Sequence, residues 1–225
     1  MNLSKLKNLL LKMPQLFLGF ILCGLGIAMM KNAGLGLNPW GIFHMGISNQ
    51  TGISFGTITQ TTGLAIILLS LPLKIIPGVG TILNMYFIGM FIDIFDRSTF
   101  IMTPEPFILK LLILVAGMCI MSGGIFFYLS CGLGAGPRDG LMLGLMKILN
   151  KPVSVIKTVI EVSAMIIGLI LGGPLGIGTV IIALSFGYCL EMTFKIGRKN
   201  AKEIEQRNLK DEYNRLFNKT QKNAE

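Results

Sequence analysis

Six long apolar runs restrict the folds that this sequence can adopt. They cover about residues 16–31, 53–73, 78–95, 108–130, 153–171 and 176–194. A helix of about 20 apolar residues crosses the hydrocarbon core of a bilayer, and the runs are close to that length. Only 14% of the residues are charged, whereas soluble domains carry about 25%. The sequence therefore predicts an all-α integral membrane protein with six transmembrane helices.

Two breaks rich in glycine and proline follow the first and fourth runs. Both have the pattern Gly-Leu-Gly-x-x-Pro, at residues 34–39 (the first break) and 132–137 (the second break). Such segments cannot continue a helix, and non-helical backbone at membrane depth is stable only beside protein or a wet cavity. We therefore expect both breaks to lie next to a functional centre. The residues that form them are Gly34, Gly36, Pro39, Gly132, Gly134 and Pro137.

The sequence matches itself when it is shifted by 98 residues. Glycines of the first run and first break fall on glycines of the fourth run and second break, and the Gly-x-Gly-Thr at 78–81 falls on that at 176–179. Each copy has three runs, and an odd number of crossings turns the second copy over in the membrane. The sequence thus predicts two inverted three-helix repeats. Transporters commonly have this design, although a duplication is also an economical way to build a bundle.

The basic residues predict the orientation and the segments of the chain. With the N-terminus in the cytoplasm, 17 of the 20 Lys and Arg residues lie on the cytoplasmic side. We therefore expect both termini to be cytoplasmic. The predicted segments are an amphipathic surface helix (1–13), the first repeat (14–97), an extracytoplasmic linker (98–107), the second repeat (108–195) and a basic cytoplasmic tail (196–225) attracted to anionic lipid.

Three motifs point to a known family. They are Asn38-Pro39-Trp40 in the first break, the segment from Gly136 to Met142 around the second break, and the two Gly-x-Gly-Thr starts. In these motifs the sequence resembles the YczE/YyaS/YitT group of bacterial integral membrane proteins, and the YczE branch most closely. The resemblance covers residues 14–195. It implies a six-span bacterial plasma-membrane protein. It does not imply a particular activity, because the family has no settled one.

Four charged residues are the strongest candidates for a substrate site. Arg138 and Asp139 follow Pro137, where a new helix would begin; the alternative is a cytoplasmic-loop arginine beside an aspartate that caps the helix. Glu161 lies about 12 Å along its helix, near the middle of the bilayer, where an ionisable group is a functional candidate. Lys157 is one turn earlier, and the alternative is that the two residues simply neutralise each other.

Other candidates follow from the repeat. Asn38 and Trp40 occupy the first break, although Trp40 also suits a membrane-interface anchor. Gln60 and Thr61 lie in the stretch equivalent to that around Glu161. Two carboxylates at equivalent positions, Asp93 and Glu191, suit either paired gates near opposite membrane faces or, as we favour, polar ends of helices.

The sequence gives little support to enzyme chemistry. The single histidine, His44, has no second His or Cys nearby, and we expect no metal site, no cofactor, no nucleic-acid partner and no enzymatic activity. Our first hypothesis is a small-solute or ion permease, or an exporter, whose polar centre holds the four charged residues. The alternatives are a non-transporting scaffold or regulatory partner and, more weakly, a substrate-capture subunit of a larger transporter. Expected partners are the lipid bilayer, a small-molecule substrate, and a protein partner or second copy of the chain.

Overall fold

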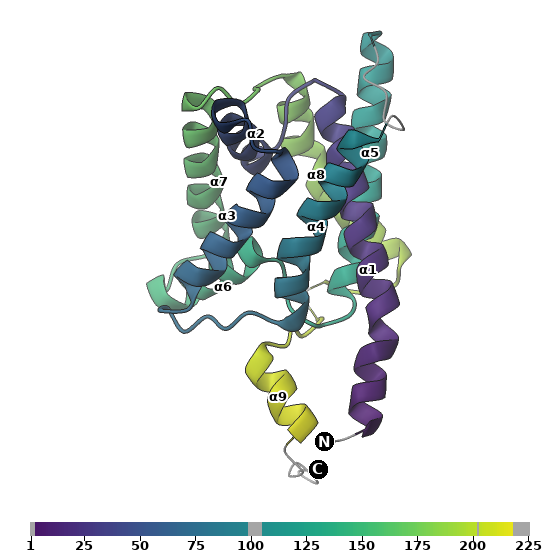
Figure 1. Cartoon of the computed structure of the whole chain (residues 1–225), viewed down its shortest axis with the longest axis vertical. Helices are drawn as coiled ribbons and strands as arrows, with labels where there is room; N and C mark the ends of the chain where they lie inside the picture. The colour runs from purple at the N-terminus through teal and green to yellow at the C-terminus, as the bar shows by residue number, and fades with distance from the viewer. Residues whose placement is uncertain (1–2, 99–104, 202, 218–225) are drawn as a thin grey trace.

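The computed structural model describes residues 3–98, 105–201 and 203–217 of the 225-residue chain. Within these ranges the chain is helical and has no strand (Figure 1). The helices are α1 (Leu3–Asn32), α2 (Pro39–Thr51), α3 (Phe55–Ser70), α4 (Val79–Arg97), α5 (Phe107–Leu129), α6 (Pro137–Leu149), α7 (Val153–Ile170), α8 (Ile177–Ile196) and α9 (Leu209–Phe217).

Five of these helices are long and apolar enough to cross a membrane, namely α1, α4, α5, α7 and α8. A sixth crossing results if α2 and α3, which meet at a bend of 115°, count as one broken span. The predicted all-α membrane fold is thus confirmed at the level of five to six spanning helices within the described ranges. α1 is one continuous helix of 30 residues, so residues 3–13 of the predicted surface segment and the first apolar run form a single helix.

The helix starts repeat with the offset found in the sequence. α2 begins at Pro39 and α6 at Pro137, and each helix has 13 residues. Proline suits the first turn of a helix because its missing N–H has no partner there in any case. α4 and α8 begin at Val79 and Ile177, also 98 residues apart. Each half of the chain therefore has the same order of helix, break, short helix and two long helices.

α1 crosses α5 at two pairs of glycines. Gly19 lies against Gly124, where a Cβ atom would be 2.8 Å from the Gly124 carbonyl oxygen. Gly26 lies against Gly117 in the same way, at 2.6 Å. Gly117 and Gly124 are the 98-residue equivalents of Gly19 and Gly26, so the contact is reciprocal. In a bilayer, where the hydrophobic effect does not hold helices together, small residues allow the close packing that does.

Each break lies on the first turn of a helix from the other half of the chain. The amide of Gly178 in α8 donates to the carbonyl oxygen of Leu35 at 2.6 Å. The amide of Gly80 in α4 donates to the carbonyl oxygen of Leu133 at 2.7 Å. The second hydrogen bond joins the residues equivalent to those of the first, with the donor and acceptor halves of the chain exchanged. Both breaks are thereby fixed by backbone hydrogen bonds at the point where they leave the helical conformation.

Glycine is required at the centre of each break. Gly36 and Gly134 have φ angles of +104° and +117°, which residues with a Cβ atom rarely adopt. A Cβ atom on Gly36 would also lie 2.6 Å from Oγ1 of Thr179, and one on Gly134 would lie 2.6 Å from Oγ1 of Thr81. The hydroxyl of Thr81 donates to the carbonyl oxygen of Ala135 in the second break.

The two halves differ in how their last two helices pack. α3 lies along α4, with Gly56 against Gly89 and the Gln60 side chain donating to the Tyr86 carbonyl oxygen at 2.8 Å. α7 and α8 barely touch each other within the described residues. Gly187, the equivalent of Gly89, faces open space. The line of contact between α3 and α4 (the α3–α4 seam) is therefore closed, and the equivalent line between α7 and α8 (the α7–α8 seam) is open.

The bundle has two distinct ends (Figure 1). At the tail end, Nε of Arg207, in the segment before α9, donates to the Gly132 carbonyl oxygen of the second break. The amide of Leu209, the first residue of α9, donates to the Pro77 carbonyl oxygen, just before α4. At the opposite end, Lys31 of α1 pairs with Asp96 of α4. The start of α1 and α9 lie at the same end, as an even number of crossings requires. Most of the predicted linker 98–107 lies outside the described residues.

Candidate functional site

A cavity of about 600 Å³ lies inside the bundle, and every helix from α1 to α8 contributes to its wall. Cavities of this size suit ligands of drug-like dimensions. Most of the wall is apolar, with Ile27, Ile88 and Phe186 among its residues. The polar side chains of the wall come from the first break and from six helices, α2 to α7: Asn38, Trp40, Thr59, Asn84, Tyr128, Arg138, Asp139, Lys157 and Glu161.

The second break places Arg138 and Asp139 in this wall. Both belong to the first turn of α6, which begins at Pro137. Gly136, the residue before it, leaves a space that three side chains face: a Cβ atom there would lie 3.6 Å from oxygen atoms of Asn84 and Asp139 and 3.8 Å from the Tyr128 hydroxyl. Three helices, α4, α5 and α6, thus bring oxygen atoms together around the break.

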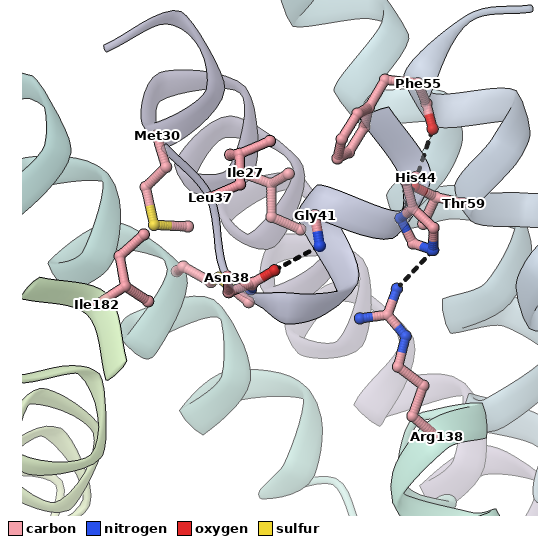
Figure 2. Close-up of a pocket in the computed structure, with 11 residues that line it drawn as sticks. Ile27, Met30, Leu37, Asn38, Gly41, His44, Phe55, Thr59, Arg138 and Ile182 are labelled. Carbon is pink, nitrogen blue, oxygen red and sulfur yellow. Dashed lines mark hydrogen bonds between the residues drawn. The ribbon is translucent and has the colours of Figure 1, made fainter. Parts of the chain in front are cut away.

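Arg138 is held against residues of the first half of the chain (Figure 2). Its guanidinium carbon lies 4.5 Å from the centre of the Trp40 ring, which is cation–π geometry. Its Nη2 lies 3.2 Å from Nε2 of His44, which is buried in α2. A smaller cavity of about 40 Å³ lies beside these groups, between Asn38, Thr59 and Ile182.

The hydrogen bonds around His44 fix its tautomer. The Thr59 hydroxyl donates to the Phe55 carbonyl oxygen at 2.9 Å, so it accepts from Nδ1 of His44 at 3.0 Å. Nε2 must then be the acceptor for Arg138, because a guanidinium can only donate. His44 is therefore neutral in this arrangement. Hydrogen bonds thus run from Arg138 through His44 and Thr59 to the Phe55 carbonyl oxygen, each group donating to the next. They connect the start of α6 to α2 and α3.

Asp139 is placed differently from its neighbour. It is exposed to the cavity, and within the described residues its carboxylate accepts no hydrogen bond and lies more than 4 Å from every Lys and Arg nitrogen. Arg138 likewise has no carboxylate oxygen within 4 Å in that part of the chain. Arg138 and Asp139 are thus a cation and an anion of the cavity wall that do not pair with each other.

Lys157 and Glu161 lie one turn apart on α7 and face each other at 3.9 Å. Their side chains are 58% and 39% exposed, and both line the cavity. The predicted pairing is therefore present, at the edge of the cavity formed by the open seam. An exposed ion pair of this length contributes little to stability.

The remaining predicted residues have local roles. Asn38 caps α2, with its side chain accepting from the Gly41 amide at 2.7 Å. Gln60 bonds α3 to α4, and the Thr61 hydroxyl bonds within α3. Neither Gln60 nor Thr61 lines the large cavity.

The two equivalent carboxylates lie in different surroundings. Asp93 accepts from the Ser54 hydroxyl and from the Gly56 amide, at 2.8 Å for the latter, and so holds the start of α3. Glu191 is exposed on α8. Asp93 thus closes the α3–α4 seam, while its equivalent makes no such contact within the described residues.

Sequence reasoning missed His44, Thr59 and Tyr128. His44 was considered only as a metal ligand; its six-residue distance from Asn38 gave no sign that it would face Arg138. Tyr128 was treated as part of an apolar run. No group of three His, Cys, Asp or Glu side chains in the described ranges is close enough to hold a metal ion.

Comparisons with known proteins point to one group. A family model described as "Family of unknown function (DUF6198)" matches residues 10–195. An "Uncharacterized protein" of Haemophilus influenzae (strain ATCC 51907 / DSM 11121 / KW20 / Rd) is 33% identical over 173 residues, covering 77% of this chain and 78% of that protein. The "Uncharacterized membrane protein YczE" of Bacillus subtilis (strain 168) is 30% identical over 190 residues, covering 83% and 87%.

A more distant relative is the "Uncharacterized protein YyaS" of Bacillus subtilis (strain 168), 22% identical over 191 residues, which cover 80% of this chain and 90% of that protein. No solved structure matches the chain. The family match includes both breaks and all of α4 to α7. The resemblance inferred from the break motifs is thereby confirmed: the chain belongs to the family of unknown function DUF6198 and is related to YczE and YyaS.

Proposed function

We propose that this protein is a small-solute permease of the bacterial plasma membrane. The observation that carries the proposal is the cavity of about 600 Å³ lined by Arg138, Asp139, Lys157 and Glu161. Charged groups inside a membrane bundle are expensive and mark solute or ion pathways. Here they face a cavity between interrupted helices, which is the usual position of a transporter binding site.

The proposal includes two inverted repeats that move against each other. Its support is the reciprocal packing of the halves: the contact of Gly178 with Leu35 recurs as the contact of Gly80 with Leu133. The glycine crossing of α1 and α5 is reciprocal in the same way. A two-fold relation between the halves accounts for both. Two equivalent seams, α3–α4 and α7–α8, then serve as gates at opposite faces of the membrane.

In this mechanism the described arrangement is one of two states. The α3–α4 seam is closed by Asp93 at the end of the bundle opposite the tail. The α7–α8 seam is open near Glu191, which lies toward the tail end. In the second state we propose that Glu191 binds the start of α7 near Ser154, as Asp93 binds the start of α3, while the α3–α4 seam opens. With both termini in the cytoplasm, the present cavity faces the cytoplasm.

The test has two stages. The purified protein is first heated with fractions of bacterial metabolites, and compounds that raise its Tm are identified. These compounds are then offered, radiolabelled, to proteoliposomes. Uptake by the wild type that is lost in Arg138→Ala and Glu161→Gln, at equal protein content, supports a permease. If no compound raises Tm and none enters the vesicles, the proposal fails, and the scaffold alternative predicts that both variants keep normal activity in cells.

A further inference from the structure

We infer that the large cavity binds a zwitterion with an apolar body, such as an amino acid with a large side chain. This inference rests on the proposed function, because it names the class of solute that the same cavity takes. It depends on two charged residues of α6, Arg138 and Asp139, and on the mostly apolar wall around them.

Arg138 and Asp139 do not form an ion pair with each other. Arg138 and Asp139 are consecutive residues of a helix, so their side chains leave it about 100° apart. Arg138 is directed toward Trp40 and His44, both of them neutral groups. Asp139 is directed toward the space that Asn84 and Tyr128 also face. Each charge is thus without an opposite charge within 4 Å among the described residues.

The other two charges of the cavity are already paired. Lys157 and Glu161 face each other at 3.9 Å, so they require no counter-charge from a ligand. The lining therefore carries one unpaired positive and one unpaired negative group, with no net charge.

A ligand that fills the cavity displaces the water that would otherwise solvate these groups. A charge that loses its water without gaining a partner costs several kcal/mol. An organic cation would leave Arg138 without a partner, and an organic anion would leave Asp139 without one. A zwitterion supplies a carboxylate to the guanidinium and an ammonium group to the aspartate. Its apolar body would contact Ile27, Ile88 and Phe186, which line the same cavity.

The inference is tested with four compounds that share one benzyl group. L-phenylalanine carries both charges, phenethylamine only the cation, 3-phenylpropionate only the anion, and 3-phenylpropanamide neither. Their affinities for the purified full-length protein are measured by titration calorimetry in nanodiscs. We expect phenylalanine to bind about 10-fold or more tightly than either singly charged compound, because a hydrogen bond to a charged group is worth about 1.5–3 kcal/mol.

Two variants assign the charges to residues. In Arg138→Gln, phenylalanine should lose its advantage over phenethylamine but keep that over 3-phenylpropionate. In Asp139→Asn the reverse should hold. Arg97→Gln and Asp211→Asn, which change the same residue types outside the cavity, should leave the ranking as in the wild type.

Two results overturn the inference. One is equal affinity of the wild type for phenylalanine and either singly charged compound; the other is no affinity for any of the four. Neither decides the proposed function, which fails only if no metabolite is taken up by the proteoliposomes. Each variant is compared across four compounds. A general loss of stability would lower all four affinities together, so it cannot produce the expected change in their order.

Discussion

Trp40 and Arg138 stack on each other although they are 98 positions apart, the offset that relates the two halves of the chain. Cys23 and Met121 have the same separation, and the Cys23 thiol lies 3.9 Å from the Met121 carbonyl oxygen. Residues that meet their own equivalents lie on a two-fold axis. In the proposed inverted repeat, the cation–π pair would therefore lie at the axis that relates the halves, and one half only contributes the charge.

This stacking predicts an energetic coupling between the two breaks. Trp40→Leu, Arg138→Gln and the double variant form a cycle, in which we expect a coupling of about 0.5–2 kcal/mol in the free energy of unfolding. Denaturant titration in micelles measures it. The same cycle with Arg97→Gln in place of the Arg138 change should give no coupling, since Arg97 is exposed at the end of α4. A zero value in both cycles would rule out the stacking as a stabilising contact.

Two adjacent glycines of α5 should respond in opposite ways to alanine. A Cβ atom on Gly124 would lie 2.6 Å from the backbone nitrogen of Cys23, whereas one on Gly123 meets nothing within 4 Å. We expect Gly124→Ala to destabilise the protein by about 1–3 kcal/mol, because α1 must move away. Gly123→Ala should be neutral or stabilise by up to about 1 kcal/mol through helix propensity. Thermal unfolding of the two variants in parallel measures this, and equal Tm values would contradict the crossing.

Asp93 should protect the start of α3 from hydrogen exchange. Its carboxylate accepts from Ser54 and from the Gly56 amide, so Asp93→Asn weakens this contact by about 1–3 kcal/mol. Exchange measured by mass spectrometry should become faster in residues 54–58. Glu191→Gln is the matched control and should leave exchange at the start of α7 unchanged in the present state. Protection that survives in Asp93→Asn would mean that other contacts close this seam.

The tail should depend on one buried ion pair. Arg207 lies 3.2 Å from Glu212, whose side chain is 5% exposed. Removing one partner of a buried pair costs about 3–5 kcal/mol, so Arg207→Gln should release α9 from the bundle. Chymotryptic cleavage near Tyr213 reports the release. Arg207→Gln combined with Glu212→Gln should restore much of the resistance, because the buried carboxylate is gone and its second partner, Arg215 at 4.0 Å, is partly exposed to water. Glu205→Gln should have no effect because Glu205 is exposed.

The orientation is open to a direct test. We expect Arg97 and Lys151 to lie on opposite faces of the membrane, with Lys151 in the cytoplasm. Single cysteines at these positions, in a chain whose four native cysteines are replaced by serine, are treated in whole cells with an impermeant maleimide. Arg97→Cys should be labelled and Lys151→Cys should not. Labelling of both would exclude the inverted repeat.

Much of the fold follows from the sequence because its signals are local. The apolar runs predict spanning helices, and the six break residues mark the points where helices stop, since Gly36 and Gly134 need backbone angles that favour glycine. The offset of 98 residues reappears in the helix starts. The sequence does not predict the difference between the α3–α4 and α7–α8 seams. Asp93 and Glu191 are equivalent in sequence, and in the proposed mechanism the conformational state decides which seam is closed.

The site could be predicted only in part, for a similar reason. Arg138, Asp139, Lys157 and Glu161 were found because ionisable residues are conspicuous among apolar ones, and all four line one cavity. Gln60 and Thr61 look equally polar in the sequence, yet their side chains bond to nearby helix backbone. His44 and Tyr128 join the site through contacts with residues more than 90 positions away or with the second break. No local pattern records such contacts.

The exchange of backbone hydrogen bonds between the breaks has a consequence for biosynthesis. The Leu35 carbonyl oxygen accepts its hydrogen bond from the amide of Gly178, near the start of the last spanning helix. While the ribosome is still making the residues between them, the first break has no such partner and must rely on water or on the translocation machinery. The half of the chain that is inserted first therefore completes its hydrogen bonds last. A chain that stalls before α8 should be recognised as incomplete by membrane quality control.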